Sequence, residues 1–576
     1  AYQEIGAEIR MIFEESEHTA IDLDAQVREE VLDELDAIDD EAWENDEALG
    51  WVYQYFGEEE REDIDQRVDE ENYKIGGTDI ATKTQLFTPR YIVEWMVDNS
   101  LGRTWLEMQG ERTNIDAEEN CFYLTPLQGS LIDREEKGVE DITVLDPACG
   151  SGHMLFYAFD ILYEMYLEEG EIPKEYIPRE ILRNNLYGID IDSGAAQIAA
   201  LSLYLKAKNK SPDITIPQLN IVSADEVLIN GERKKEVLDK ANSELEEEIL
   251  EQIWRSFDNI REWGSLVRIE NQVDELLEDY RDTFESKGQA QFTDDGNLTT
   301  QSTFVSGGEE QTWEELKNRL VENVQEIASA ALEQDDPVEE MFANEVGKTV
   351  ELLDVLRDEY DVVLSNPPYL YRDKMSDSLK NFIKENYIGS RDIYAAFIER
   401  CMDFAGDDGY VSMITMESFM FLYSFRKLRP YILDEANITD VAHLEHRDEG
   451  HMNVAFSMRI SNDQRVKSKF ARLTDSDNKA ESLNEVTRNQ RSGIETNDVY
   501  SLDQSSFREI DRTPFIYWFG QEVLQLFIDE PALGDEADVM EGLATGDDDL
   551  FLRNWWEIDT NKISDEYEWI ARSGDG

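Results

Sequence analysis

The chain has 576 residues, of which 41% are hydrophobic, and this composition supports a large folded core and excludes a disordered chain. It contains no run of 18 apolar residues and no signal peptide at its first residues, so we expect a soluble, cytoplasmic protein that does not contact a membrane. Three scattered cysteines exclude a disulfide framework, and five histidines without metal-ligand spacing argue against a zinc or iron site.

Acidic residues outnumber basic ones by 130 to 53, which gives a net charge of −77. They are spread along the chain instead of forming one tail, a pattern typical of adaptation to a salt-filled, haloarchaeal-type cytoplasm. At about 1 M salt the Debye length is only about 3 Å, so surface carboxylates repel one another weakly. The net charge therefore does not exclude DNA as a partner.

Helices come first in the chain and then alternate with strands. Residues 1–80 are predicted as an N-terminal helical region, and Thr88 and Pro89 as the N-cap and first residue of a further helix. Short apolar strands, each followed by a turn or a helix, are predicted at 142–148, 185–191 and 219–225. This alternation predicts an α/β fold with a parallel sheet and helices on its faces.

The second half of the chain interrupts the sheet and then resumes it. Residues 231–350 follow a helical pattern and are predicted as a helical insertion. Strands return at 360–369, 409–419 and 438–446. The pattern weakens beyond residue 480 and the sequence stops without a closing helix or cap, so we expect a truncated C-terminal region at 481–576.

The stretch VLDPACGSGHML, residues 144–155, runs a strand through a glycine turn into a helix. Parallel sheets bind ligands beyond the carboxyl ends of their strands, and Gly150 and Gly152 allow the backbone to approach such a ligand closely. No Lys-Ser or Lys-Thr follows, so the turn is not a phosphate-binding loop. Asp146 within it favours a ligand with a cationic end.

Carboxylates also end the next two predicted strands. Asp190 stands where a ribose diol is held in related sheets, and Asp225 is placed to accept from the exocyclic amine of adenine. In a chain with 130 acidic residues, either one alone fits a solvated strand end. Following the glycine turn in order, they describe S-adenosylmethionine better than NAD.

The fourth strand leads into SNPPY, residues 365–369. The prolines fix an extended turn that holds the Asn366 side chain, whose oxygen can accept from one amino group together with the Pro367 carbonyl. Two acceptors on a planar amine raise its nucleophilicity. Tyr369 offers a flat face for a base, worth about 1–3 kcal/mol in stacking.

These motifs resemble those of amino-methylating DNA methyltransferases. DPACGSG, GIDID, SAD and NPPY resemble their motifs I to IV, and LFTPRYIV resembles motif X in the order of the N6-adenine gamma class. ATKTQLFTPRYIVEWMVDNSLGRTWLE and GLATGDDDLFLRNWWEI resemble the PglX methyltransferases of BREX phage-defence systems. The resemblance covers residues 80–460 and 540–570.

The resemblance implies a Rossmann-like class I methyltransferase sheet that marks host DNA at adenine N6 with S-adenosylmethionine. Double-stranded DNA and other BREX proteins would be its partners, and the adenine would be flipped out of the duplex. Residues 81–230 would form the cofactor-binding half, 351–480 the catalytic half, and 481–576 the start of a DNA-recognition region.

The resemblance also assigns individual roles. The cofactor would be held by Thr88 and Pro89 at the methionine end, by Asp146, Ala148, Gly150 and Gly152 along the turn, by Asp190 at the ribose and by Asp225 at the adenine. The target base would be held by Asn366, Pro367, Pro368 and Tyr369. The family commonly places an aromatic residue after a later strand, where this chain reads HRDEGHMNVAF and His451 is the nearest flat side chain.

Two alternatives and one expected absence accompany this interpretation. The chain could be a non-catalytic subunit that senses cofactor or DNA in a defence complex. It could instead methylate protein glutamine, since release-factor methyltransferases also use Asn-Pro-Pro-Tyr. No acidic pair followed by Glu-x-Lys on a strand is found, so we expect no DNA cleavage by this chain.

Overall fold

The computed structural model describes residues 25–39, 48–77, 79–84, 88–126, 134–216, 219–224, 251, 260–268, 348, 351–444, 453–461 and 467–531. The chain divides into two compact units, Ala1–Trp518 and Phe519–Gly576. The described part of the second unit contains one helix, α23 (Gln521–Asp529).

One sheet runs through the first unit, with nine strands among the described residues in the order β3-β2-β1-β4-β5-β7-β6-β8-β9. The strands β3, β2, β1, β4 and β5 are parallel, whereas β7 is antiparallel to both of its neighbours and β9 to β8. The strands are β1 (Val144–Asp146), β2 (Leu186–Asp190), β3 (Asn220–Ser223), β4 (Tyr360–Ser365), β5 (Ala405–Met416), β6 (Ala436–His443), β7 (Asn453–Ile460), β8 (Ser468–Arg472) and β9 (Val499–Leu502). The chain order reverses between β1 and β4, which is where ligands bind in such sheets.

The central strands are apolar because both of their faces are buried. Val144 and Leu145 are neighbours in β1, yet they belong to two different core clusters. Val363 in β4 likewise joins the cluster of Leu145, while Val362 and Leu364 join that of Val144. Alternate residues of a strand point to opposite faces, so one strand supplies both cores. We call these the Val144 face and the Leu145 face.

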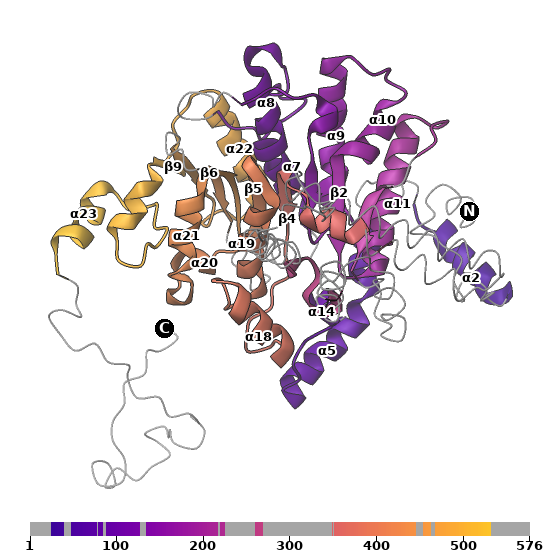
Figure 1. The fold of residues 1–576 in the computed structure, drawn as a ribbon, viewed down its shortest axis with the longest axis horizontal. Helices are drawn as coiled ribbons and strands as arrows, with labels where there is room; N and C mark the ends of the chain where they lie inside the picture. Colours follow the sequence, from indigo (N-terminus) through magenta and orange to yellow (C-terminus); the bar gives the residue numbers. More distant parts are fainter. Residues whose placement is uncertain are drawn as a thin grey trace, which may run out of the picture. The chain divides into compact units, whose positions relative to one another are not determined.

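Helices cover both faces, and Figure 1 shows α8 and α9 on one side of the strands and α18 on the other. The Val144 face is covered by α7 (Arg90–Val97), α8 (Arg103–Gln109), α9 (His153–Glu169), α10 (Ile177–Glu180), α11 (Ser193–Lys210) and α22 (Lys479–Arg491). The Leu145 face is covered by α5 (Glu58–Glu71), α6 (Asp79–Thr84), α14 (Ile260–Trp263), α18 (Asp377–Asn386), α19 (Ile393–Phe404), α20 (Ser418–Phe421) and α21 (Leu428–Glu435).

The remaining elements are short or lie before the sheet. They are α2 (Ala25–Asp36), α4 (Ala48–Phe56), η1 (Asp98–Gly102), η2 (Gly110–Arg112), η3 (Val139–Asp141), η4 (Ile181–Asn185), η5 (Gly264–Leu266), η6 (Tyr423–Phe425) and η7 (Gln504–Glu509). Of these, α4 packs against α11.

The predicted Rossmann-like α/β sheet is confirmed, and each of the six predicted strands overlaps an observed one. In the described part of 1–80 the predicted helices are present. The predicted helix start is wrong by one residue: the helix begins at Arg90 and Pro89 is its N-cap, with an extended ψ of 138°. Most of the predicted helical insertion at 231–350 lies outside the described residues, apart from residue 251, residue 348 and the segment 260–268.

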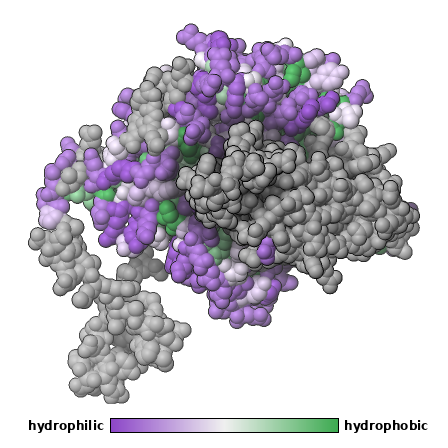
Figure 2. Space-filling view, viewed as in Figure 1, coloured by the Kyte–Doolittle hydropathy of each residue, from purple (hydrophilic) through white to green (hydrophobic). Residues whose placement is uncertain are grey.

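The described surface in Figure 2 is mainly hydrophilic. On the face shown in Figure 2, hydrophilic side chains (purple) dominate over hydrophobic ones (green). Within the described ranges, no helix has the length and hydrophobicity needed to span a bilayer.

Candidate cofactor and target-base site

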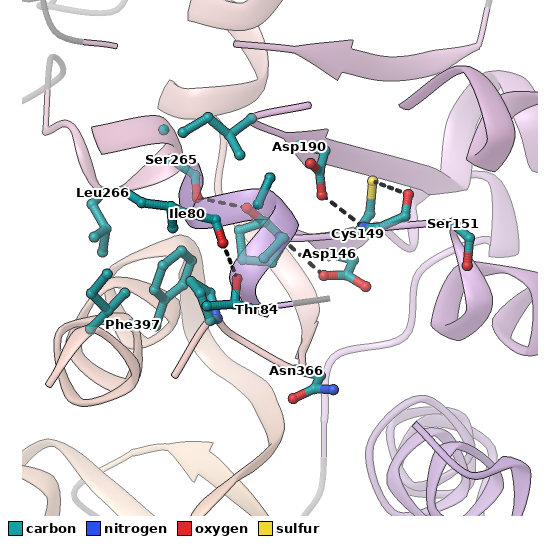
Figure 3. Close-up of a pocket in the computed structure, with 18 of the residues that line it drawn as sticks. Ile80, Thr84, Asp146, Cys149, Ser151, Asp190, Ser265, Leu266, Asn366 and Phe397 are labelled. Carbon is teal, nitrogen blue, oxygen red and sulfur yellow. Dashed lines mark hydrogen bonds between the residues drawn. The ribbon is translucent and has the colours of Figure 1, made fainter. Parts of the chain in front are cut away.

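A pocket of about 150 Å³ lies at the carboxyl ends of β1, β2 and β4. Figure 3 shows Asp146, Asp190 and Asn366 on one side of it, with Leu266 and Phe397 across from them. The carboxylates and the amide therefore meet an apolar wall. Residues far apart in the sequence form this pocket, among them Tyr53, Ile80, Thr88, Asp146, Gly150, Asp190, Trp263, Ser265, Asn366 and Phe397.

The glycine turn connects β1 to α9 through two residues with positive φ. Gly152 has φ +79°, and a Cβ there would lie 2.9 Å from the Cβ of Ala199, so a larger residue would collide with α11. Gly150 has φ +53°, and a Cβ there would meet nothing within 4 Å. The first glycine of the turn thus faces open space in the pocket, and the second allows two helices to pack closely.

Asp146 ends β1 with its carboxyl group buried. One carboxyl oxygen accepts from the backbone N–H of Ala148 at 3.1 Å. Burial raises the pKa of Asp146 to about 8, since desolvation disfavours the carboxylate more than this hydrogen bond supports it. A cation bound beside Asp146 would offset that penalty.

Asp190 ties the end of β2 to the glycine turn. Its Oδ2 accepts from the backbone N–H of Gly150 at 2.8 Å, and its Oδ1 from that of Asp192 at 2.9 Å. Burial raises the pKa of Asp190 to about 6 despite these two bonds. An ionised carboxylate has about four lone-pair sites, so it can still accept from a ligand hydroxyl.

Asn366 follows β4 and its carboxamide is held from two sides. Its Nδ2 donates to Thr88 Oγ1 at 2.9 Å, and its Oδ1 lies 2.9 Å from the hydroxyl of Tyr369. The same hydroxyl lies 3.0 Å from the carbonyl oxygen of Ile414 in β5, and its single proton can serve only one acceptor at a time. A carboxamide oxygen has two lone pairs and can accept more than one hydrogen bond.

Several lining residues were not predicted from the sequence. Tyr53 of α4 donates to the carboxylate of Asp192, which also caps α11. Ser265 of η5 donates through Oγ to the carbonyl oxygen of Pro147 at 2.6 Å. The buried guanidinium of Arg400 in turn donates from Nε to the carbonyl oxygen of Ser265 at 2.8 Å. No local motif marks these residues, because each contact joins segments that are far apart in the chain.

The predicted site residues fall into three groups. Thr88, Asp146, Ala148, Gly150, Asp190, Asn366 and Pro368 line the pocket together. Pro89, Pro367 and Tyr369 are adjacent to these in the chain, Gly152 lies two residues after Gly150, and these four are not among the lining residues. Asp225 and His451 lie outside the described residues.

A metal site is not found in the part of the chain that the structure describes. Within it, no three His, Cys, Asp or Glu side chains are grouped so that they could hold a metal ion. The polar side chains that line the pocket are three carboxylates, one carboxamide, one imidazole, one indole and several hydroxyls, and the carboxylates are Asp146, Asp190 and Glu262.

Comparison with known proteins gives two family matches. Residues 184–449 match the Eco57I restriction-modification methylase family, and residues 128–219 match the DNA-methyltransferase domain of MmeI. The first interval contains Asp190 and the segment from Asn366 to Tyr369.

Two curated relatives are similar over most of this chain. The chain is 30% identical to the adenine-specific methyltransferase BrxX of Escherichia coli O9:H4 (strain HS), over 92% of this chain and 42% of that protein. It is 28% identical to the adenine-specific methyltransferase PglX of Lacticaseibacillus casei (strain Zhang), over 90% of this chain and 41% of that protein. The chain thus spans about two fifths of the length of both relatives. Among solved structures, the DrdV–DNA complex is 13% identical with a TM-score of 0.41, over 84% of this chain and 34% of that chain.

Proposed function

We propose that this chain carries the catalytic domain of a site-specific DNA methyltransferase that transfers a methyl group from S-adenosylmethionine to adenine N6. The observation that carries the proposal is the shared pocket of Asp146, Asp190 and Asn366 at three neighbouring strand ends. The similarity to two adenine-specific methyltransferases supports the choice of adenine in DNA.

The pocket has the chemistry that S-adenosylmethionine requires. The charged methionine end of the cofactor would lie by Asp146 and the glycine turn, and the ribose hydroxyls of the cofactor would donate to Asp190. Apolar side chains such as Trp263, Leu266 and Phe397 offer a wall for the adenine ring. Bound there, the cofactor supplies an electrophilic methyl group on a sulfonium.

The target amine would be held by Asn366 Oδ1 and the carbonyl oxygen of Pro367. Two acceptors bound to the N6 hydrogens favour a pyramidal nitrogen, so its lone pair leaves conjugation with the ring and becomes available for the methyl group. The nitrogen–carbon bond would form as the sulfur–carbon bond breaks, and the methylated nitrogen would then release one proton to water. Positioning is the main catalytic device in such a reaction, because no covalent enzyme intermediate is required.

The proposed biological role rests on the similarity to these relatives. Similarity to BrxX and PglX supports host-DNA marking in a BREX-type phage-defence system, with other proteins of that system as partners. A sensor that binds the cofactor and DNA without methylating is the alternative, and it would keep the pocket but not need the Asn366 oxygen.

Modified-base sequencing tests the proposal. DNA from cells that carry the gene is compared with DNA from cells that carry an Asn366→Ala version. We expect N6-methyladenine in one sequence motif to disappear in the variant, while calorimetry at near-molar KCl shows S-adenosylmethionine binding to both proteins. Binding by both without any modified motif would favour the sensor and contradict the proposal.

A further inference from the structure

Two loops beside the target-base site are held together by one buried arginine. Arg429 of α21 is 1% exposed and donates to carbonyl oxygens on both loops. On the segment after β5, which includes α20, the acceptors are the carbonyl oxygens of Phe419 at 2.8 Å and Leu422 at 2.9 Å. On the segment that follows η7, the acceptors are the carbonyl oxygens of Arg512 and Thr513, each at 2.9 Å. Among the described residues Arg429 forms no ion pair, and its guanidinium instead holds the backbone of both segments through these hydrogen bonds.

The two loops present an exposed tyrosine between two further arginines. Tyr423 is 56% exposed, and its ring centroid lies 4.0 Å from the guanidinium carbon of Arg426 and 4.8 Å from that of Arg512. Arg512 adopts φ +67°, an uncommon conformation for a residue with a side chain, which the clamp of Arg429 helps to hold. We call Tyr423, Arg426 and Arg512 the Tyr423 platform.

The segment that carries Tyr423 is basic, in contrast to the acidic chain as a whole. Residues 418–433 contain Arg426, Lys427 and Arg429 and no acidic residue, although acidic residues outnumber basic ones by 130 to 53 overall. Arg512 is paired with Asp511 at 3.1 Å, but both side chains are more than half exposed, so this pair is weak. The Tyr423 segment is therefore locally basic, and it carries an exposed aromatic side chain beside two arginines.

Packed aromatic rings connect the platform to the target-base site. The ring of Tyr369 lies 6.1 Å from that of Tyr394, which lies 5.9 Å from that of Phe425 in the same turn as Tyr423. The hydroxyl of Tyr394 is also 2.6 Å from Oγ of Ser418, at the start of the same loop. The platform is thus fixed relative to Asn366, as a surface that contacts nucleotides next to a flipped base must be.

We propose that the Tyr423 platform binds the DNA strand next to the target adenine. Arg426 and Arg512 would each contact a backbone phosphate, and the Tyr423 ring would hold both guanidinium groups in position through cation–π contacts. This inference rests on the proposed action on DNA and adds the surface that holds it. Guanidinium groups bind phosphate through paired, charge-assisted hydrogen bonds, which persist in salt better than long-range attraction does.

Direct DNA binding tests the platform without depending on methylation. The purified protein is titrated into a fluorescein-labelled pool of 40-base-pair duplexes of mixed sequence, from about 0.2 to 1 M KCl. The double variant Arg426→Gln/Arg512→Gln is compared with Arg488→Gln, which removes a charge from an arginine 5.4 Å from the ring of Phe122 on the Val144 face. Tyr423→Ala is compared with Tyr423→Phe, which keeps the ring.

The double variant is expected to bind DNA about tenfold or more weakly, and its slope of log affinity against log salt should fall by about two, one for each lost phosphate contact. Tyr423→Ala should weaken binding, and Tyr423→Phe and Arg488→Gln should change it little. Melting temperature and S-adenosylmethionine affinity should stay unchanged throughout. If the platform variants bind DNA as tightly as the wild type and the Arg488→Gln control do, the inference is overturned. A wild-type protein that does not bind DNA would also overturn it. A third outcome separates the two proposals. If the wild type binds DNA without ever methylating it, and the platform variants bind more weakly, the platform is supported and only the proposed activity is contradicted.

Discussion

Replacing Thr88 by valine separates two roles that this residue can have. The sequence places Thr88 at the cofactor, whereas in the structure its hydroxyl also accepts from Nδ2 of Asn366 at 2.9 Å. Valine has a similar shape but no hydroxyl, so the packing around this 6% exposed side chain should persist. What changes is the restraint on the Asn366 carboxamide.

The size of the effect follows from one neutral hydrogen bond. Such a bond contributes about 1 kcal/mol net, and each 1.36 kcal/mol in the barrier changes a rate tenfold. If the bond orients Asn366 Oδ1 toward the target amine, kcat of Thr88→Val should fall about fivefold. The dissociation constant of S-adenosylmethionine should stay nearly constant.

The assay measures transfer of a labelled methyl group to unmodified DNA at near-molar KCl, alongside cofactor binding by calorimetry. Thr88→Ser is the matched control because it keeps the hydroxyl, and it should retain most of the wild-type kcat. An unchanged kcat in Thr88→Val, or a weaker cofactor affinity with kcat intact, would refute the positioning role.

Three further predictions concern the pocket. Asp190→Asn keeps an acceptor for the N–H of Gly150 but loses the charge, and it should bind S-adenosylmethionine about tenfold more weakly by calorimetry, a change of about 1.4 kcal/mol; undiminished affinity would exclude Asp190 from the cofactor site. Gly152→Ala places a Cβ against Ala199 and should lower the free energy of unfolding by about 1–3 kcal/mol, whereas Gly150→Ala, with nothing within 4 Å, should cost less; equal melting temperatures would contradict this. Burial raises the pKa of Asp146 to about 8, above its ordinary value near 3.9, so the stability that its proton contributes is fully present below about pH 4 and is lost as the pH rises through about 8; urea unfolding between pH 6.5 and 8.5 should show this slope, and Asp146→Asn should flatten it.

Much of the sheet could be predicted because strands such as β1 and β4 carry short apolar runs. Two of the three strands that were missed, β7 and β8, contain buried basic residues that interrupt such a pattern. In β7, Ser457 is fully buried and Arg459 is 3% exposed and paired with Asp408 at 2.7 Å. In β8, Lys469 is 4% exposed. A charged residue in a short strand predicts a surface, and only its partner from a distant segment explains its burial.

The candidate site likewise contains residues that could be predicted from the sequence and contacts that could not. Asp146, Asp190 and Asn366 could be predicted because each follows a recognisable strand and all such ends meet at one edge of a parallel sheet. The bond between Thr88 and Asn366 spans 278 residues, and that between Ser265 and Pro147 spans 118. Neither has a local signature, since tertiary packing alone brings these groups together.

The anchorage of Ser265 by Arg400 has a consequence for engineering this chain. The segment 260–268 is a wall of the pocket, although it lies within the stretch 231–350 whose pattern suggests a removable insertion. A deletion that excises the whole stretch would remove that wall, and the buried Arg400 guanidinium would lose two backbone acceptors, the carbonyl oxygens of Ser265 and Val267. A shortened version of the chain should instead keep residues 260–268 and place its deletions before and after that segment.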